Sequence, residues 1–188
     1  LVYRSGALGG MQLSMVWVDR KGITTPMNSE KRGYISPAFS PDGRRIAVSI
    51  NDPSGSDIWI YEIGRGVLTR LTFDGVGNSM PLWTPDGAQI AFTALGDKGV
   101  PNVFMKRADG ASDAVLLYAS ANAEYSVSFG PDGKTLAIFE RDPETQWDLA
   151  MLHPGEKSAP QTFLKTKAIE GFPMFSPDGK WIAFGSNR

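Results

Sequence analysis

The sequence predicts an all-β fold built from repeated four-stranded antiparallel sheets, and three observations point to it. A four-residue turn, Ser-Pro-Asp-Gly or a close variant, occurs four times, with its aspartates 44, 46 and 46 residues apart. An alternating run of apolar residues follows each turn, and a period of two is typical of strands rather than helices. A repeat of about 45 residues that holds four short strands is typical of a β-propeller blade.

Each of the four turns has the chemistry of a hairpin. Proline fixes φ at about −65° at the first corner, aspartate suits the second, and glycine takes the left-handed conformation that closes the hairpin with a bulge. This local role explains the recurring aspartates better than a catalytic set of acids does. The predicted structural turn residues are Pro41, Asp42, Gly43, Pro85, Asp86, Gly87, Pro131, Asp132, Gly133, Pro177, Asp178 and Gly179.

The strands of a blade follow the turn in a fixed order. The second strand carries an alanine between two large residues, which suits a strand covered on both faces by stacked blades. The third strand opens with Asp or Asn, at Asp57, Asn102 and Asp148, and a fourth strand closes the blade. We therefore treat 1–188 as one propeller segment, with complete blades at 34–79, 80–124 and 125–170 and partial blades at 1–33 and 171–188.

Composition and charge exclude several classes of protein. With 19 Lys and Arg against 20 Asp and Glu, the net charge is −1, so the chain lacks the basic surface that nucleic-acid binding needs. The longest apolar run covers the six residues 114–119, whereas a membrane span needs roughly 20, so no membrane insertion is expected. The chain has no cysteine, which removes disulfides and thiolate chemistry. It opens without a start Met or a signal peptide, which favours a piece of a longer protein.

No catalytic constellation is visible, and we expect no enzyme activity, no cofactor and no metal site. His153 is the single histidine, and neither a Gly-x-Ser-x-Gly elbow nor a phosphate-binding glycine loop is present. Acids between the second and third strands offer oxygen atoms of the kind that calcium prefers. The loop at 52–57 nevertheless lacks the Asp-x-Asp-x-Asp-Gly calcium pattern. These loop acids are Asp52, Asp97, Asp142 and Glu144.

Residues at the mouth of the central channel are the candidate binding site. One residue stands eight positions before each turn aspartate, just ahead of the innermost strand, where a propeller channel opens. Polar and aromatic groups that converge on one mouth can bind a ligand or partner, although loop residues are commonly polar in any case. The predicted binding residues are Arg32, Tyr34, Asn78, Glu124 and Glu170.

The repeat resembles that of the TolB-type family, also called the WD40-like or PD40 repeat. The resemblance rests on Ser-Pro-Asp-Gly followed by Ile-Ala and later by Asp-Ile-Trp, and its four copies cover essentially the whole chain. The segments 16–22, 68–73 and 175–183 are further similar to propellers appended to bacterial receptor-like serine/threonine kinases. The resemblance implies a periplasmic or otherwise extracytoplasmic bacterial protein. It also implies a non-catalytic propeller for protein–protein interaction or ligand sensing, as in TolB, which contacts an outer-membrane lipoprotein across the propeller mouth.

The same resemblance leaves two enzyme classes open. TolB-type repeats also form the gating propeller of prolyl-oligopeptidase-like serine peptidases, whose chemistry lies in a separate α/β-hydrolase domain. Some related propellers are polysaccharide lyases, which need a base and usually a metal cluster, and a single histidine serves that chemistry poorly.

The partial end blades predict an assembly. Both ends carry a second strand, at 1–4 and 181–184, and their blades hold apolar side chains as large as Trp17 and Phe175. Leaving such faces in water costs about 25 cal/mol per Å². Either the two ends meet within one molecule, or two chains complete each other in a ring of about eight blades. We favour a homodimer, because four blades close a very tight ring and because the duplicated second strand fits poorly in a single circle.

Overall fold

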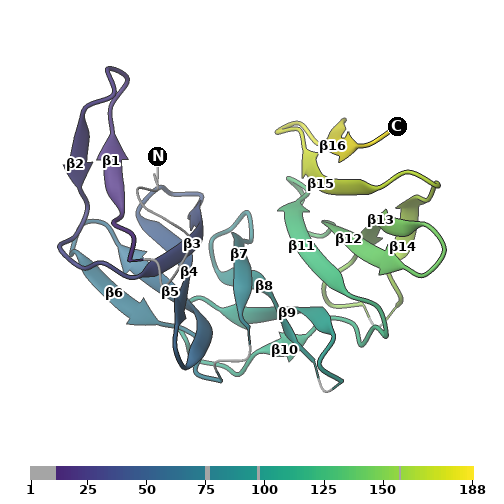
Figure 1. Cartoon of the computed structure of the whole chain (residues 1–188), viewed down its shortest axis with the longest axis horizontal. Coiled ribbons are helices and arrows are strands. Elements are labelled where there is room, and N and C mark those ends of the chain that lie inside the picture. Colours follow the sequence, from purple (N-terminus) through teal and green to yellow (C-terminus); the bar gives the residue numbers. More distant parts are fainter. Residues whose placement is uncertain (1–11, 75–76, 97, 157) are drawn as a thin grey trace. The chain divides into compact units, whose positions relative to one another are not determined.

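The computed structural model describes residues 12–74, 77–96, 98–156 and 158–188, and this part of the chain contains sixteen β-strands and no helix (Figure 1). The prediction of an all-β fold is confirmed. The predicted second strand at 1–4 lies outside the described residues. Accordingly, the described chain holds no helix that is long and apolar enough to cross a membrane.

Three four-stranded antiparallel sheets repeat the same meander, in which each strand pairs with the next one in the sequence. The first sheet is β3 (Gly33–Phe39), β4 (Arg45–Asp52), β5 (Gly55–Glu62) and β6 (Val67–Arg70). The second is β7 (Ser79–Trp83), β8 (Gln89–Leu95), β9 (Pro101–Arg107) and β10 (Val115–Leu116). The third is β11 (Glu124–Phe129), β12 (Leu136–Asp142), β13 (Gln146–Leu152) and β14 (Gln161–Leu164). These sheets are the four-stranded blades that the repeat predicts.

Two further sheets have two strands each in the described part of the chain. β1 (Val16–Val18) pairs with β2 (Thr24–Pro26), and β15 (Glu170–Phe175) pairs with β16 (Ile182–Ser186). By their place in the repeat, β15 and β16 are the first and second strands of a blade. β1 and β2 come directly before β3, so they are a third and a fourth strand.

The four Pro-Asp-Gly turns share one geometry. Each glycine N–H donates to the carbonyl three residues earlier, at 2.8 to 2.9 Å, and each glycine has φ between 68° and 70°. In the first turn, the Asp42 carboxylate accepts hydrogen bonds from the Ser40 hydroxyl (2.6 Å) and the Arg44 N–H (3.0 Å). The Ser40 hydrogen bond, followed by that from Arg44, lowers the pKa of Asp42. The turn is therefore held by its own side chains, without a ligand.

The described chain divides into two compact units, which meet in sequence between Pro81 and Leu82. The core of the first unit is built on the first sheet and the segment before it, from Leu13, Met15, Tyr34, Ile46, Val48, Ile50 and Tyr61. The core of the second unit joins its two complete sheets, through Ala91, Val103, Leu136, Ile138, Ala150 and Leu152. The second strands of the complete sheets supply much of this buried surface, as alternation with a central alanine predicts.

Candidate binding surface

A cavity of about 440 Å³ opens in the first unit, at the end of the β3–β4 hairpin that is opposite its Pro-Asp-Gly turn. The lining of the cavity combines apolar side chains with lysine, arginine, asparagine and aspartate. An apolar hollow with a few polar groups is the usual form of a binding site. The cavity is lined by Gln12, Leu13, Lys31, Arg32, Gly33, Ile35, Ile50, Asn51, Asp52 and Pro53.

Arg32 is the predicted site residue that lines this cavity. Its backbone forms an antiparallel bridge with Leu13, through N–H to carbonyl hydrogen bonds of 2.8 and 3.0 Å. Its guanidinium lies over the Trp59 ring, 4.9 Å from the centroid, and its Nε donates to the Glu30 carboxylate at 2.7 Å. Backbone pairing, ring contact and ion pair together hold this cation in one orientation before any partner arrives.

Tyr34 lies two residues further along and faces the core instead. Its side chain is buried beside Leu13 and Met15, and its hydroxyl accepts a hydrogen bond from Asn28 Nδ2 at 3.2 Å. Burial raises the pKa of Tyr34, partly offset by the hydrogen bond from Asn28. Tyr34 is therefore part of the core of the first unit and is not exposed at the surface.

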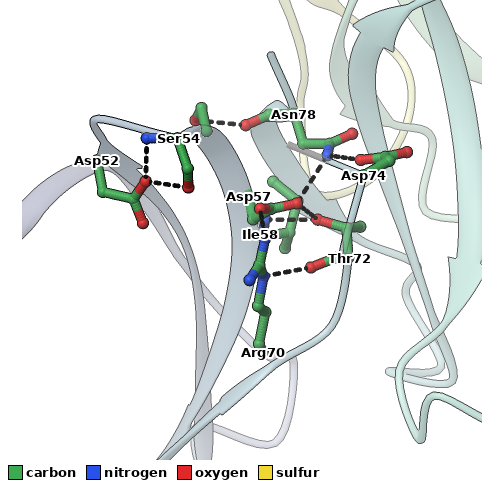
Figure 2. Close-up of polar contacts among 9 residues, drawn as sticks. Asp52, Ser54, Asp57, Ile58, Arg70, Thr72, Asp74 and Asn78 are labelled. Carbon is green, nitrogen blue, oxygen red and sulfur yellow. Dashed lines mark hydrogen bonds and ion pairs between the residues drawn. The ribbon is translucent and has the colours of Figure 1, made fainter. Parts of the chain in front are cut away.

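Asn78 belongs to a buried polar network centred on Asp57, which Figure 2 shows. Asn78 Nδ2 donates to Asp57 Oδ1 at 3.0 Å and also to the Asp74 carboxylate. The Asp57 carboxylate also accepts from the Thr72 hydroxyl at 2.7 Å and forms an ion pair with Arg70. The network ties the start of β5 to the loop after β6. Asp57, the aspartate near the start of this third strand, is thus held by side-chain donors.

Glu124 is fully buried at the start of β11, and neither of its carboxylate oxygens has a hydrogen-bond partner of normal geometry among the described residues. It pairs across the sheet with Glu140 on β12, and Glu140 pairs with Asp148 on β13. Directly paired residues share a face and lie about 5 Å apart. Burial, reinforced by the charge of Glu140 and partly offset by the nearby Ser120 hydroxyl, raises the pKa of Glu124 to about 7.

Glu124, Glu140 and Asp148 form a row of paired carboxylates across β11, β12 and β13. The other two members of this row, Glu140 and Asp148, add to the repulsion between negative charges. Burial, followed by the charges of Asp148 and Asp142, raises the pKa of Glu140. Asp148 is buried, accepts a hydrogen bond from the Thr145 hydroxyl at 2.5 Å, and has its other oxygen without a partner in the described chain. At the equivalent positions the first sheet has a single carboxylate, because Tyr34 pairs with Ile50 and Ile50 with Asp57.

Glu170 is buried at the start of β15 but has partners. Its Oε1 accepts from the Thr166 hydroxyl at 2.7 Å and from the Arg188 guanidinium at 3.1 and 3.2 Å. Of the five predicted residues, Tyr34, Glu124 and Glu170 lie in three different sheets, whereas Arg32 and Asn78 come just before β3 and β7. Arg32 lines a cavity, whereas Tyr34, Asn78, Glu124 and Glu170 are buried, so their role in binding stays a prediction.

Two of the loop acids that could serve calcium, Asp52 and Asp142, have local partners. Asp52 accepts from the Ser54 N–H and hydroxyl, and these hydrogen bonds lower its pKa, the hydroxyl having the larger effect. Asp142 pairs with Lys165 Nζ at 2.5 Å, and Asp97 lies outside the described residues. No three His, Cys, Asp or Glu side chains of the described chain are arranged to hold a metal ion. His153 is half-exposed, with Nδ1 3.4 Å from the Lys134 carbonyl.

Two features were not predicted from the sequence: the part that Lys31 has in the cavity, and the row of paired carboxylates Glu124, Glu140 and Asp148 in the third sheet. The Lys31 contribution to the cavity has no signal in the repeat. The carboxylate row does have one, because Glu124 and Glu140 stand eight residues before and eight residues after the turn aspartate Asp132. A hairpin pairs residues that are symmetric about its turn, so the two glutamates could have been placed opposite each other.

Comparison with known proteins agrees with this architecture. The fold is that of a β-propeller built from hairpin-centred four-stranded blades. Residues 20–161 match the sequence profile of the TolB beta propeller domain, PD40, and the chain belongs to that family.

The relatives are much longer than this chain. It is 30% identical over 178 residues to the uncharacterized peptidase YuxL of Bacillus subtilis, a match that covers 93% of the chain and 25% of YuxL. It is 27% identical over 152 residues to the Tol-Pal system protein TolB of Francisella tularensis, covering 79% of the chain and 34% of that protein. The crystal structure of TolB from Acinetobacter baumannii superposes with a TM-score of 0.75 at 20% identity, covering 93% of the chain and 43% of that structure. The chain thus spans between a quarter and a third of the curated relatives' length.

Proposed function

We propose that this chain is a non-catalytic propeller segment that binds a protein partner through the cavity around Arg32. The observation that carries the proposal is the cavity itself, about 440 Å³, which is lined by apolar residues and by two cationic side chains, Lys31 and Arg32. Similarity to the Tol-Pal system protein TolB supports a protein-binding role. The resemblance to TolB also supports a periplasmic or other extracytoplasmic setting.

The cavity suits one kind of partner. Leu13, Ile35 and Ile50 offer apolar contact to a single inserted side chain. Lys31 is exposed and has no ion-pair partner among the described residues, and Arg32 is already oriented by Trp59. The partner is therefore an extended peptide segment with an apolar side chain next to a carboxylate.

Selection of displayed peptides against the purified chain tests this proposal. The expected result is enrichment of peptides that place an apolar residue beside Asp or Glu, with binding weakened by Arg32→Ala and largely retained in Arg32→Lys. Arg44→Ala is the matched control, because Arg44 is an exposed arginine at the turn end of the same hairpin. Equal losses from both alanine variants, with unchanged melting temperatures, would contradict the cavity as the site.

The gating propeller of a serine peptidase is a second candidate, and the match to YuxL over 93% of the chain favours it. In that case the Arg32 cavity would meet substrate peptides, and the nucleophile would lie in a separate hydrolase domain. The chain alone should then bind peptides without cleaving them, and the sequence that flanks it in its gene should contain a Gly-x-Ser-x-Gly elbow. An assay for unsaturated uronates tests the lyase alternative on the same preparation.

A further inference from the structure

A second cavity, of about 570 Å³, opens within the second unit. The β8–β9 hairpin, the segment before β11 and the β12–β13 hairpin each contribute to its lining. This lining combines small apolar residues and two prolines with one asparagine and one arginine. The lining residues are Gly99, Val100, Pro101, Ala121, Asn122, Ala123, Arg141 and Pro143.

The repeat relates this cavity to the one around Arg32 in the first unit. Both are lined by residues nine to eleven positions before and after a turn aspartate, at the end of the hairpin opposite the turn. The turn aspartate is Asp42 for the first cavity and Asp132 for the second. In both, the residue eleven positions after the aspartate is a proline, Pro53 or Pro143. The two cavities are therefore equivalent positions of the repeat.

An arginine and an asparagine exchange places between the two cavities. In the first, the arginine stands ten residues before the turn aspartate and the asparagine nine residues after it; in the second, the order is reversed. Each cavity thus keeps one guanidinium and one amide in its lining, although the positions differ. The two pairs are Arg32 with Asn51 and Arg141 with Asn122.

Hydrogen bonds within the second unit hold the walls of its cavity. Asn102 is buried, and its Nδ2 donates to the carbonyl oxygens of Pro101 at 3.0 Å and Asn122 at 3.3 Å. The Arg141 N–H donates to the Ala123 carbonyl at 2.8 Å. These bonds join the start of β9, the segment before β11 and the end of β12, so the cavity has its form before any ligand binds.

The Arg141 guanidinium gives this cavity its charge. Arg141 is exposed and has no ion-pair partner among the described residues, and the neighbouring Asp142 is paired with Lys165. The other residues of the lining are uncharged. A cation beside apolar groups attracts a carboxylate more strongly than one in open water, because fewer water molecules compete. The complementary group is a carboxylate on an aliphatic stem, as in a glutamate side chain.

We infer that this cavity is a second docking site for an acidic peptide segment, in which Arg141 pairs with a glutamate carboxylate and Val100 contacts the glutamate stem. The class of partner rests on the proposed function, whereas the site itself does not, because no residue of the Arg32 cavity contributes to it. The chain therefore binds two acidic segments, one on each unit.

Amide NMR spectra of the isotope-labelled chain, titrated with acetyl-Leu-Glu-Leu-Glu-amide, test the inference. The expected result is a shift of the Ala123 and Arg141 amide signals, in addition to that of Gly33 in the Arg32 cavity. The matched peptide acetyl-Leu-Gln-Leu-Gln-amide should move these signals far less, because it keeps the shape of the side chains and removes their charge.

Variants then assign the shifts to the second cavity. Arg141→Ala should weaken binding at this cavity by about fivefold or more, and Arg141→Lys by less. Lys134→Ala removes one positive charge from an exposed position at the turn end of the same hairpin and should leave the affinity unchanged. Ala121→Trp, at an exposed position of the lining, should obstruct the cavity without changing its charge.

The outcomes separate this inference from the proposed function. Shifts at Gly33 alone would overturn the second site and leave the proposed function standing. Shifts at Ala123 and Arg141 alone would support the second site and contradict the first, and no shift at either would overturn both. Equal losses from Arg141→Ala and Lys134→Ala would reveal a general charge effect and overturn the inference. Full binding in a folded Ala121→Trp variant would overturn it as well.

Discussion

The buried carboxyl group of Glu124 makes the stability of this protein depend on pH. The informative perturbation is Glu124→Gln, which keeps the shape of the side chain and removes its charge. Glu124 is fully buried with no hydrogen-bond partner of normal geometry in the described chain, and it faces Glu140 across the sheet. Its ionised form is therefore disfavoured in the folded state only, because the unfolded chain leaves it in water.

The size of the stability loss follows from the pKa of Glu124 in the folded protein and in the unfolded chain. In the folded protein the pKa of Glu124 is raised to about 7 from its ordinary 4.5. Below pH 4.5 the group is protonated in both states and contributes nothing. As pH rises towards 7, the unfolded chain ionises first and stability falls; above 7 the loss is complete, about 3 kcal/mol. Since Glu140 lies opposite, the observed midpoint belongs to the pair.

Thermal unfolding at pH 4.5, 6 and 8 measures this effect. At pH 8 the Glu124→Gln variant should melt about 6 to 12 °C above the parent, and the difference should shrink towards pH 4.5. Glu156→Gln, at an exposed turn position, should stay within about 0.5 kcal/mol of the parent at every pH. If Glu124→Gln gave the same difference at all three pH values, or lowered the melting temperature at pH 8, the electrostatic argument would be refuted.

Three further predictions concern the turns, the polar network and the fold. Gly43→Ala should lower the free energy of unfolding by about 1 to 2 kcal/mol, because the residue needs φ of 68°. Gly179→Ala should lower it further in urea unfolding, because the added Cβ would lie 2.9 Å from Pro131 Cγ. Equal losses from the two variants would count against this packing. Asn78→Ala should destabilise by about 2 to 3 kcal/mol, since it removes a buried donor from Asp57, and a loss below about 0.5 kcal/mol would show that the network contributes little. Far-UV circular dichroism should show a β spectrum, and one dominated by helix would contradict the fold.

The fold was accessible from sequence because its determinants are local. Proline, aspartate and glycine determine each turn through the conformations open to them, and the alternation around Ala47 and its counterparts determines the strands on either side. The third strands were equally visible through the Asp or Asn that opens them. The repeat could not show which strands meet between sheets, because that depends on contacts far apart in the sequence.

The candidate site was only partly accessible. Arg32 was predicted at the mouth of the central channel; the structure shows that it lines a cavity in the first unit, and its role in binding stays a prediction. The residues eight positions before each turn were predicted at a channel mouth, and their side chains are buried; Tyr34, Glu124 and Glu170 pair inside their hairpins. Some of their partners come from loops, such as Asp74 for Asn78 and Thr166 for Glu170, and loop geometry leaves no periodic signal.

The position eight residues before each turn aspartate has different side-chain partners in each repeat. Tyr34 meets an asparagine donor, Asn78 bridges two aspartates, and Glu170 is held by Arg188 and Thr166. Glu124 meets another carboxylate. All four residues stand at the same distance before their turn, so the turn motif determines where the residue lies in the repeat but not the charge of its surroundings. A buried acid that lacks a counter-charge lowers stability at neutral pH, whereas Asn at the same position in the preceding repeat carries no charge. The third sheet therefore contains a carboxyl group whose raised pKa lowers stability as pH rises towards 7, whereas in the first sheet Arg70 gives the buried Asp57 carboxylate a counter-charge.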